Sequence, residues 1–177
     1  YSDSNLLEDI TKEYDQIIEN PCKLMSRYIG ESLSIKRDMI QRDEFDKGER
    51  KVFNYGHTFG HAIEALSSYK VSHGLAVTIG MDIANFVAVG LGISNMQHFE
   101  RMHNVLGKNS KTFRQVHISV DRLMVALSKD KKNSTTQLRL ILPGKDGYIG
   151  IGLYDNNDEL VKTIYKYFKK YMSEQLT

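Results

Sequence analysis

Apolar residues recur three or four positions apart near the start of the chain, which is the spacing of one face of a helix. The first such run covers residues 5–19 and consists of Leu6, Ile10, Tyr14 and Ile17. Asn20 and Pro21 end this run, and Pro21 suits the first turn of a second helix that extends to about residue 41. The pattern therefore predicts two consecutive helices, followed by a turn at residues 46–49.

Helical periodicity returns after this turn and is followed by one β pattern. It predicts helices at residues 50–67, 74–91, 96–106 and 120–129, and a last one that begins after Asn157. Residues 137–142 and 148–153 are short apolar runs on either side of the sequence PGKDG, which is typical of a β-hairpin. The predicted fold class is mainly α with one small β-hairpin, and we take residues 1–177 as one helical domain.

Charged residues are scarce in the middle of the chain and common on either side. Residues 52–99 contain only Glu64, Lys70 and Asp82. Such a centre is typical of a buried core that solvated elements surround. The net charge of +2 over 177 residues gives no reason to expect nucleic acid as a partner.

Cysteine content and hydropathy indicate a protein of the cytoplasm. Cys22 is the only cysteine, so the chain can form no internal disulfide, and this fits a reducing compartment. The best apolar stretch, residues 75–93, carries Thr78, Asp82 and Asn85, so we expect no membrane span and no membrane partner. The first residues also lack the basic-then-apolar pattern of a signal peptide.

Polar residues form a regular row in the segment that starts at residue 50. If residues 50–66 are one helix, the row is a continuous stripe at i, i+4, i+7 and i+11 that consists of Arg50, Asn54, His57 and His61. The rest of this segment is largely apolar, and an unpaired buried polar group costs about 1–3 kcal/mol. The row therefore predicts that something polar faces it, and a metal ion or an anionic ligand is the economical candidate.

The histidines of this row are candidates for metal binding or proton transfer. His57 and His61 are four positions apart, so both can approach one metal, or one can bind while the other transfers a proton. Two histidines at this spacing are more often ordinary surface or core residues, and Thr58 stands where the zincin motif needs glutamate. His73 follows in a loop that could return to the same place, which favours a site.

Three lysines outside this segment could be either solvated residues or partners of an anion. Lys36 lies on one stripe of the second helix with Met25, Ile29 and Ile40, the face that we expect to pack inward. A lysine there either extends its amine to solvent or faces an anion. Lys131 and Lys132 suit a solvated basic helix end, which interacts favourably with the helix dipole.

Residues 54–64, with the sequence NYGHTFGHAIE, together with residues 73–77, HGLAV, resemble the signature of 3-dehydroquinate synthase and its sugar-phosphate cyclase relatives. The likeness extends to residues 80–81 and to Lys36, Asp43, Glu44, Arg50 and the DKK sequence of residues 130–132. The resemblance implies the helical C-terminal domain of a two-domain enzyme, whose N-terminal domain binds NAD and is absent from this chain. It also implies a cytoplasmic lyase that forms 3-dehydroquinate and phosphate from 3-deoxy-D-arabino-heptulosonate 7-phosphate, in the shikimate pathway of aromatic amino acid biosynthesis.

The resemblance also assigns a role to each candidate residue. It implies a divalent metal, usually zinc, held by one glutamate and two histidines, which map onto His57 and His73. The glutamate is expected before the first residue of this chain, so we expect the chain alone to be inactive. His61 maps onto a catalytic histidine. By the same resemblance, Asn54 and one of Lys131 and Lys132 bind the phosphate side of the substrate. Lys36 and Arg50 bind its carboxylate.

One departure from the signature leaves the substrate open. Leu75 replaces the glutamate that usually follows His-Gly, which could alter the support of His73 or mark a relative such as 2-epi-5-epi-valiolone or 2-deoxy-scyllo-inosose synthase. Those enzymes act on sugar phosphates without a carboxylate, so Lys36 and Arg50 favour dehydroquinate synthase. The alternatives are a metal-dependent polyol dehydrogenase and a non-catalytic helical interaction domain. The resemblance also implies a homodimer.

Overall fold

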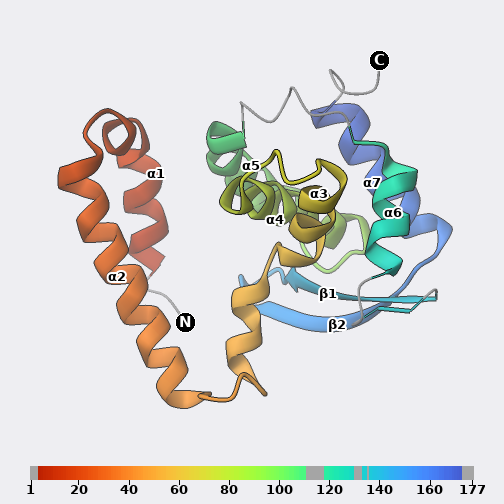
Figure 1. The fold of residues 1–177 in the computed structure, drawn as a ribbon, viewed down its shortest axis with the longest axis horizontal. Helices are drawn as coiled ribbons and strands as arrows, with labels where there is room; N and C mark the ends of the chain where they lie inside the picture. Colours follow the sequence, from red (N-terminus) through yellow and green to blue (C-terminus); the bar gives the residue numbers. More distant parts are fainter. Residues whose placement is uncertain (1–3, 111–117, 130–132, 135, 173–177) are drawn as a thin grey trace. The chain divides into compact units, whose positions relative to one another are not determined.

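The computed structural model describes residues 4–110, 118–129, 133–134 and 136–172, and the chain divides into two compact units (Figure 1). The first unit covers residues 1–51 and the second covers residues 52–177. The described residues are mainly helical with one two-stranded antiparallel hairpin, which confirms the predicted fold class. That residues 1–177 act as one metal- and substrate-binding domain stays a prediction.

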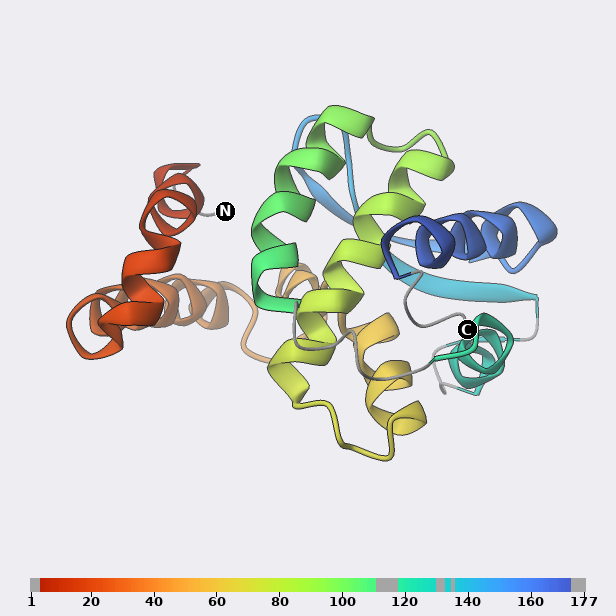
Figure 2. The ribbon, with the colours of Figure 1, turned by 90° about the horizontal axis from the view of Figure 1, so that it is seen from above.

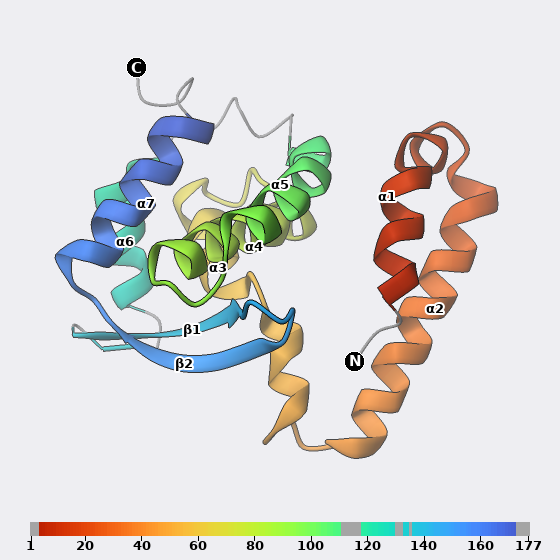
Figure 3. The same cartoon turned by 180° about the vertical axis from the view of Figure 1, so that it is seen from behind.

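The first unit consists of α1 (Ser4–Glu19) and α2 (Pro21–Arg42), which pack against each other (Figure 3). Pro21 occupies the first turn of α2, as predicted. Tyr28 on α2 is buried, and its hydroxyl donates a hydrogen bond to Oε2 of Glu13 on α1 at 2.7 Å. Nη2 of Arg27 on α2 also pairs with Oδ2 of Asp9 on α1 at 2.9 Å, so a buried and an exposed polar contact both join the two helices.

The expectation that Met25 and Ile29 face inward on α2 is wrong. Their side chains are 40% and 51% exposed, whereas Tyr28 is 6% exposed. The reason is that α1 packs on the side of α2 that carries Tyr28, and adjacent helix positions differ by about 100° around the axis. Lys36, which was predicted on the same stripe, is exposed as well.

The second unit is built around α4 (His73–Gly90), which crosses its middle (Figure 2). In chain order its elements are the end of a 3-10 helix η1 (Glu49–Asn54), α3 (His57–Leu66), α4, α5 (Met96–Ser110), α6 (Val120–Ser128), β1 (Gln137–Pro143), β2 (Ile149–Asp155) and α7 (Asp158–Tyr171). α4 contacts α3, α5, α7 and β1. Its buried side chains, among them Ile79, Ile83 and Val87, form the centre of the core, as the charge-poor middle of the sequence predicted.

The hairpin of β1 and β2 lies against the helices of the second unit on one side (Figures 1 and 3). The strands pair antiparallel with Leu140 opposite Gly152, and the leucines of β1 alternate with exposed residues at the start of the strand. Leu138, Leu140 and Leu142 are all buried in the core. The hairpin predicted from two apolar runs around a turn is therefore confirmed. β1 ends one residue later than predicted, and β2 begins one residue later and ends two residues later.

The prediction of one continuous helix over residues 50–67 is wrong. η1 ends at Asn54 and α3 begins at His57. Between them Gly56 adopts φ 79°, a left-handed conformation that favours glycine. A Cβ at Gly56 would lie 2.8 Å from the carbonyl oxygen of Val77, so α4 passes too close for a side chain here. Because of this break, Arg50 and Asn54 do not continue the stripe of the α3 histidines on one α-helix.

Glycines also let α3 and α4 approach each other closely. A Cβ on Gly80 would lie 2.0 Å from the carbonyl oxygen of Gly56 and 2.7 Å from the backbone nitrogen of Gly60. These distances are far shorter than any side-chain carbon tolerates, so the two backbones touch at this crossing. The small residues of α4 permit this close packing.

A buried polar network joins α4, α5 and α7. Oδ2 of Asp82 accepts hydrogen bonds from the hydroxyl of Tyr167 and from Nδ1 of His103, both at 2.7 Å. Asp82 is only 4% exposed. Burial, followed by the charge of Asp82, raises the pKa of Tyr167 well above its usual value. The network fixes three helices to one another through residues far apart in the sequence.

Among the described helices, α4 has the length and composition of a membrane span. Its mean hydropathy is 1.3 over 18 residues, and 56% of that stretch is buried in the structure. The buried core helix of a folded domain meets the same criteria, and α4 contacts four other elements of the second unit.

Candidate metal and substrate site

Three histidines from α3 and α4 lie together. His57 is the first residue of α3, His61 follows one turn later, and His73 is the first residue of α4. The centroids of their rings are 5.2 Å apart for His57 and His73, 5.4 Å for His57 and His61, and 5.8 Å for His61 and His73. Rings at this separation can direct nitrogens at one ion, because zinc binds histidine nitrogen at about 2.0–2.1 Å.

The surroundings of His57 favour a neutral ring that offers Nε2. Its Nδ1 lies 3.3 Å from the carbonyl oxygen of Tyr55. A carbonyl can only accept, so Nδ1 carries the proton and Nε2 keeps its lone pair. The pKa of His57 is lowered, mainly by burial. The hydrogen bond to the Tyr55 carbonyl raises this pKa, and the nearby His61 and His73 lower it further. Metal binding needs this neutral form.

His73 has the same arrangement with a different acceptor. Its Nδ1 lies 3.2 Å from both carboxylate oxygens of Glu64, which is on α3. The side chain of Glu64 is 14% exposed and that of His73 is 56% exposed. Nδ1 of His73 therefore faces a largely buried carboxylate, and Nε2, at the other side of the ring, is left for a ligand.

His61 differs from the other two histidines. It is exposed, and its ring makes no hydrogen bond with any residue in the described part of the chain. A possible ligand atom on each of His61, Glu64 and His73 lies within 4.8 Å of the others. The two imidazoles and one carboxylate of this group are ligand types that zinc accepts. The site can therefore hold a divalent metal. His61 is the one of the three histidines whose ring has no hydrogen-bond partner among the described residues.

The structure brings together only part of the predicted site. His57, His61 and His73 lie together, and Asn54 is half-buried at the end of η1, three positions before His57. Lys36 and Arg50 belong to the first unit, so their placement beside the histidines stays a prediction. Lys131 and Lys132 lie outside the described residues.

Asp43 organises the loop that leads to Arg50. Its carboxylate accepts hydrogen bonds from three backbone N–H groups, those of Lys47 at 2.9 Å, Gly48 at 2.8 Å and Arg50 at 3.0 Å. Nη1 of Arg50 donates to the carbonyl oxygen of Glu44 at 2.8 Å. The hydrogen bond from the backbone of Lys47 lowers the pKa of Asp43 most. Burial raises this pKa, and the hydrogen bonds from Gly48 and Arg50 lower it further, so that the pKa stays below its usual value. The loop thus fixes both ends of Arg50.

This loop is expected to loosen in acid. The pKa of Asp43 is lower in the folded chain than in the unfolded chain, so its stabilising effect is complete above the ordinary aspartate pKa of about 3.9 and is lost as the pH falls through the folded value. Asp43→Ala should remove the effect at any pH. Hydrogen exchange at the backbone amides of Lys47, Gly48 and Arg50 measures it. Equal protection of these amides in the wild-type chain and in Asp43→Ala near neutral pH would contradict this role.

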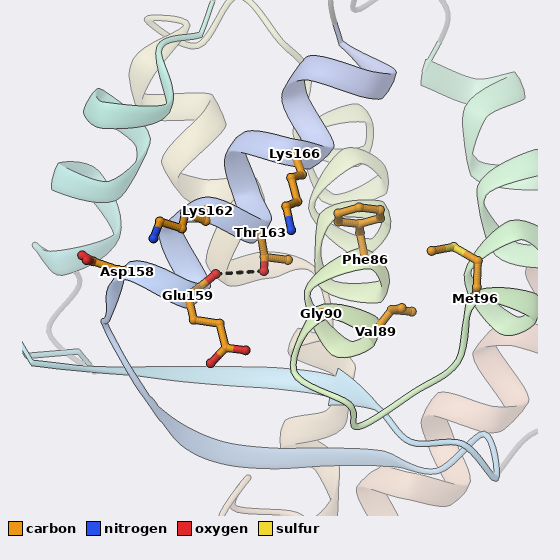
Figure 4. A pocket seen from close by; sticks show the side chains of 9 residues that line it. All are labelled: Phe86, Val89, Gly90, Met96, Asp158, Glu159, Lys162, Thr163 and Lys166. Carbon is orange, nitrogen blue, oxygen red and sulfur yellow. Dashed lines mark hydrogen bonds between the residues drawn. The ribbon is translucent and has the colours of Figure 1, made fainter.

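The cavity that Figure 4 shows lies elsewhere. It has a volume of about 600 Å³ and lies at the end of α4 opposite His73. Phe86, Val89 and Met96 form an apolar wall, and Lys162 and Lys166 reach it from α7. None of the residues that line it was predicted as a site residue.

The sequence analysis gave no role to two acidic residues, one that contacts His73 and one that holds the loop of Arg50. Glu64 lies three positions after His61, a spacing that puts both on one side of a helix and could have indicated a shared site. Asp43 precedes Gly48 by five positions, and an aspartate before a glycine turn is a signal for backbone capping. The partner of His73 was not predictable from spacing alone.

A helical unit in which three histidines and a carboxylate from two adjacent helices lie together has the features of a metal-binding enzyme domain. A family model described as 3-dehydroquinate synthase C-terminal matches residues 1–133. The chain belongs to this family, the C-terminal domain of 3-dehydroquinate synthase.

Curated relatives agree with this assignment. The chain is 34% identical over 172 residues to a 3-dehydroquinate synthase of Helicobacter pylori, a match that covers 96% of the chain and 47% of that protein. It is 32% identical over 160 residues to the enzyme of Prochlorococcus marinus, covering 89% of the chain and 44% of that protein. The chain therefore spans about half the length of the curated relatives it matches.

Two solved structures share the fold. A 2-deoxy-scyllo-inosose synthase complexed with carbaglucose-6-phosphate, NAD+ and Co2+ superposes with a TM-score of 0.69 at 22% identity, covering 81% of this chain and 42% of that one. The 2-epi-5-epi-valiolone synthase of Streptomyces hygroscopicus subsp. jinggangensis 5008, with NAD+ and Zn2+ bound, gives 0.69 at 16% identity, covering 96% and 47%. At these identities the likeness supports the fold alone.

Proposed function

We propose that this chain is the metal- and substrate-binding half of a 3-dehydroquinate synthase, a lyase that converts 3-deoxy-D-arabino-heptulosonate 7-phosphate to 3-dehydroquinate and phosphate. One observation supports this most. The two histidines that the family signature gives to the metal, His57 and His73, each hold Nδ1 against an oxygen acceptor and leave Nε2 free. His61, to which the signature gives proton transfer, has no such anchor among the described residues.

We propose that His57 and His73 hold the divalent metal, zinc by preference, with a glutamate from the N-terminal half of the whole protein. That half also binds NAD in our proposal, because solved relatives with about twice the length carry NAD+ together with Co2+ or Zn2+. A bound divalent metal lowers the pKa of a substrate hydroxyl and polarises a carbonyl. Two histidines alone bind such a metal weakly, so the chain without its other half is expected to be inactive.

A substrate with a phosphate and a carboxylate needs cationic and polar partners. In the proposal Lys36 and Arg50 bind the carboxylate, and Asn54 binds at the phosphate end with Lys131 or Lys132. The Glu44 carbonyl holds Nη1 of Arg50, which leaves the remaining guanidinium N–H groups for a bidentate contact. His61 transfers a proton near neutral pH, as an unanchored imidazole can.

The competing proposal is a cyclase that acts on a sugar phosphate without a carboxylate, as the fold likeness to 2-deoxy-scyllo-inosose synthase allows. Assay of the whole protein with both substrates separates the two. We expect turnover of the heptulosonate phosphate and little or none of sedoheptulose 7-phosphate. Preference for sedoheptulose 7-phosphate would contradict the proposal. A homodimer in the cytoplasm accompanies it as a further expectation.

Arg50→Ala in the whole protein is expected to weaken binding of the heptulosonate phosphate by about 1.5–3 kcal/mol, the value of a hydrogen bond to a charged group. This is a rise in Kd of roughly 10- to 150-fold, which calorimetry can measure. Arg37→Ala is the matched control, because Arg37 is exposed on α2 and, among the described residues, its side chain bonds with its neighbours Asp38 and Ser34. Equal affinities in the two variants would reject a carboxylate contact at Arg50.

A further inference from the structure

Glu64 contacts His73 but has no role of its own in the proposed site. Both carboxylate oxygens of Glu64 lie 3.2 Å from Nδ1 of His73. Glu64 comes from α3 and His73 from α4, so the contact spans the two helices that carry the histidines. Within the described residues no other acidic side chain bonds to His73, and Leu75, two positions further on, packs against the apolar core.

We propose that Glu64 is a positioning residue that holds His73 with its proton on Nδ1 and its Nε2 directed at the metal. The inference rests on the proposed function, because it takes His73 as a metal ligand. A carboxylate behind a ligating imidazole fixes the tautomer and the ring orientation and makes the free nitrogen a better donor. Glu64 is not a catalytic residue here, since it acts through His73.

The burial of the two partners favours this role over direct coordination by Glu64. The carboxylate is on the buried side of the ring, with 14% of the Glu64 side chain exposed, whereas 56% of the His73 side chain is exposed. A metal bound between Glu64 and His73 would coordinate Nδ1 of His73, and Nε2 of His73 would then point away from the metal. His57 supports the first arrangement independently, since the Tyr55 carbonyl occupies its Nδ1 and only its Nε2 is free. Both ligands then present the same nitrogen.

The contact makes a prediction for the metal-free chain. In ¹⁵N-labelled protein at about pH 8.5, roughly two units above the ordinary histidine pKa, His73 should carry its proton on Nδ1. Unrestrained histidine prefers the proton on Nε2, so the signature is distinctive. Glu64→Gln should keep the Nδ1 proton, because the amide oxygen still accepts, and Glu64→Ala should lose it. Glu100→Gln, a glutamate exposed on α5, should change nothing.

Added zinc then tests the direction of the ring. Zinc should perturb Nε2 of His73 and of His57, and Glu64→Ala should raise the zinc Kd by about 10- to 100-fold, the usual loss when such a support is removed. Glu64→Gln should lose less. Perturbation of Nδ1 of His73 by zinc would make Glu64 a direct ligand and overturn the inference, as would a proton on Nε2 of His73 in the metal-free wild-type chain.

The failure of this inference can be told from the failure of the proposed function. The tautomer of His73 in the metal-free chain needs neither metal, substrate nor the N-terminal half. A proton on Nδ1 that is lost in Glu64→Ala supports the hold of Glu64 on the ring even if the whole protein has no synthase activity. A proton on Nε2 in the wild-type chain overturns that hold even if the synthase activity is found.

Discussion

His57→Ala and His73→Ala are each expected to remove bound zinc from the whole protein and to abolish its activity. Each variant takes away one of the proposed protein ligands, and a structural or catalytic zinc site rarely survives with two. Loss of even an outer support costs about 10- to 100-fold in metal affinity or activity, so loss of a ligand should exceed 100-fold. Metal analysis of the purified variants, followed by the synthase assay, measures both effects.

His61→Ala is the control within the same cluster. Its ring lies 5.4 Å from that of His57 and 5.8 Å from that of His73, yet it is proposed to transfer a proton and not to bind metal. The variant should keep its zinc and lose about 10²- to 10⁴-fold in kcat. If His61→Ala loses zinc as His57→Ala does, or His57→Ala keeps a full equivalent, the ligand assignment is wrong, and the group of His61, Glu64 and His73 becomes the better site.

Elements that depend on local sequence were predictable. The hairpin followed from two short apolar runs on either side of the sequence PGKDG, and in the structure Gly147 of this turn adopts φ 82°. The last helix followed from its apolar stripe, and Asn157 caps it by accepting a hydrogen bond from the backbone nitrogen of Leu160 at 3.0 Å. Such signals act over a few residues, so a single sequence contains them.

Features that depend on distant partners were not predictable. The helix predicted over residues 50–67 breaks at Gly56 because α4 passes against it, and periodicity says nothing of a neighbouring helix. Asp82 meets His103, 21 positions later, and Tyr167, 85 positions later, without any spacing that would mark them as partners. Propensity and period are local, whereas these contacts are set by tertiary packing.

One part of the candidate site was predictable from local spacing, and the other part depends on tertiary contacts. His57 and His61 were recognisable as neighbours because four positions make about one helical turn. His73 was placed with them only because it follows in a loop, and the structure shows how the chain brings it back. α3 and α4 cross at Gly60 and Gly80, which brings the first residue of each helix to the same place. The geometry of the site thus depends on a glycine contact outside it.

Gly80→Ala is therefore expected to destabilise the chain and to disturb the site. The new Cβ would lie 2.0 Å from the Gly56 carbonyl oxygen, and backbone atoms cannot turn aside as a side chain does. Overpacking in a core costs about 1–3 kcal/mol, and a backbone collision belongs at the upper end, against a gain of about 1 kcal/mol in helix propensity. A loss of about 2–3 kcal/mol should lower the Tm by roughly 4–12 °C in a calorimetric scan.

Gly107→Ala separates the collision from helix propensity. Gly107 is inside α5, and no atom lies within 4 Å of a Cβ built there, so this variant should be as stable as the wild type or more stable by up to about 1 kcal/mol. Equal Tm values for the two variants would show that α3 and α4 can separate freely. If Gly80→Ala has the lower Tm, the new Cβ has forced α3 and α4 apart at a cost in stability. The shift then moves His73 away from His57, and the zinc Kd of the folded variant should rise although no ligand has changed.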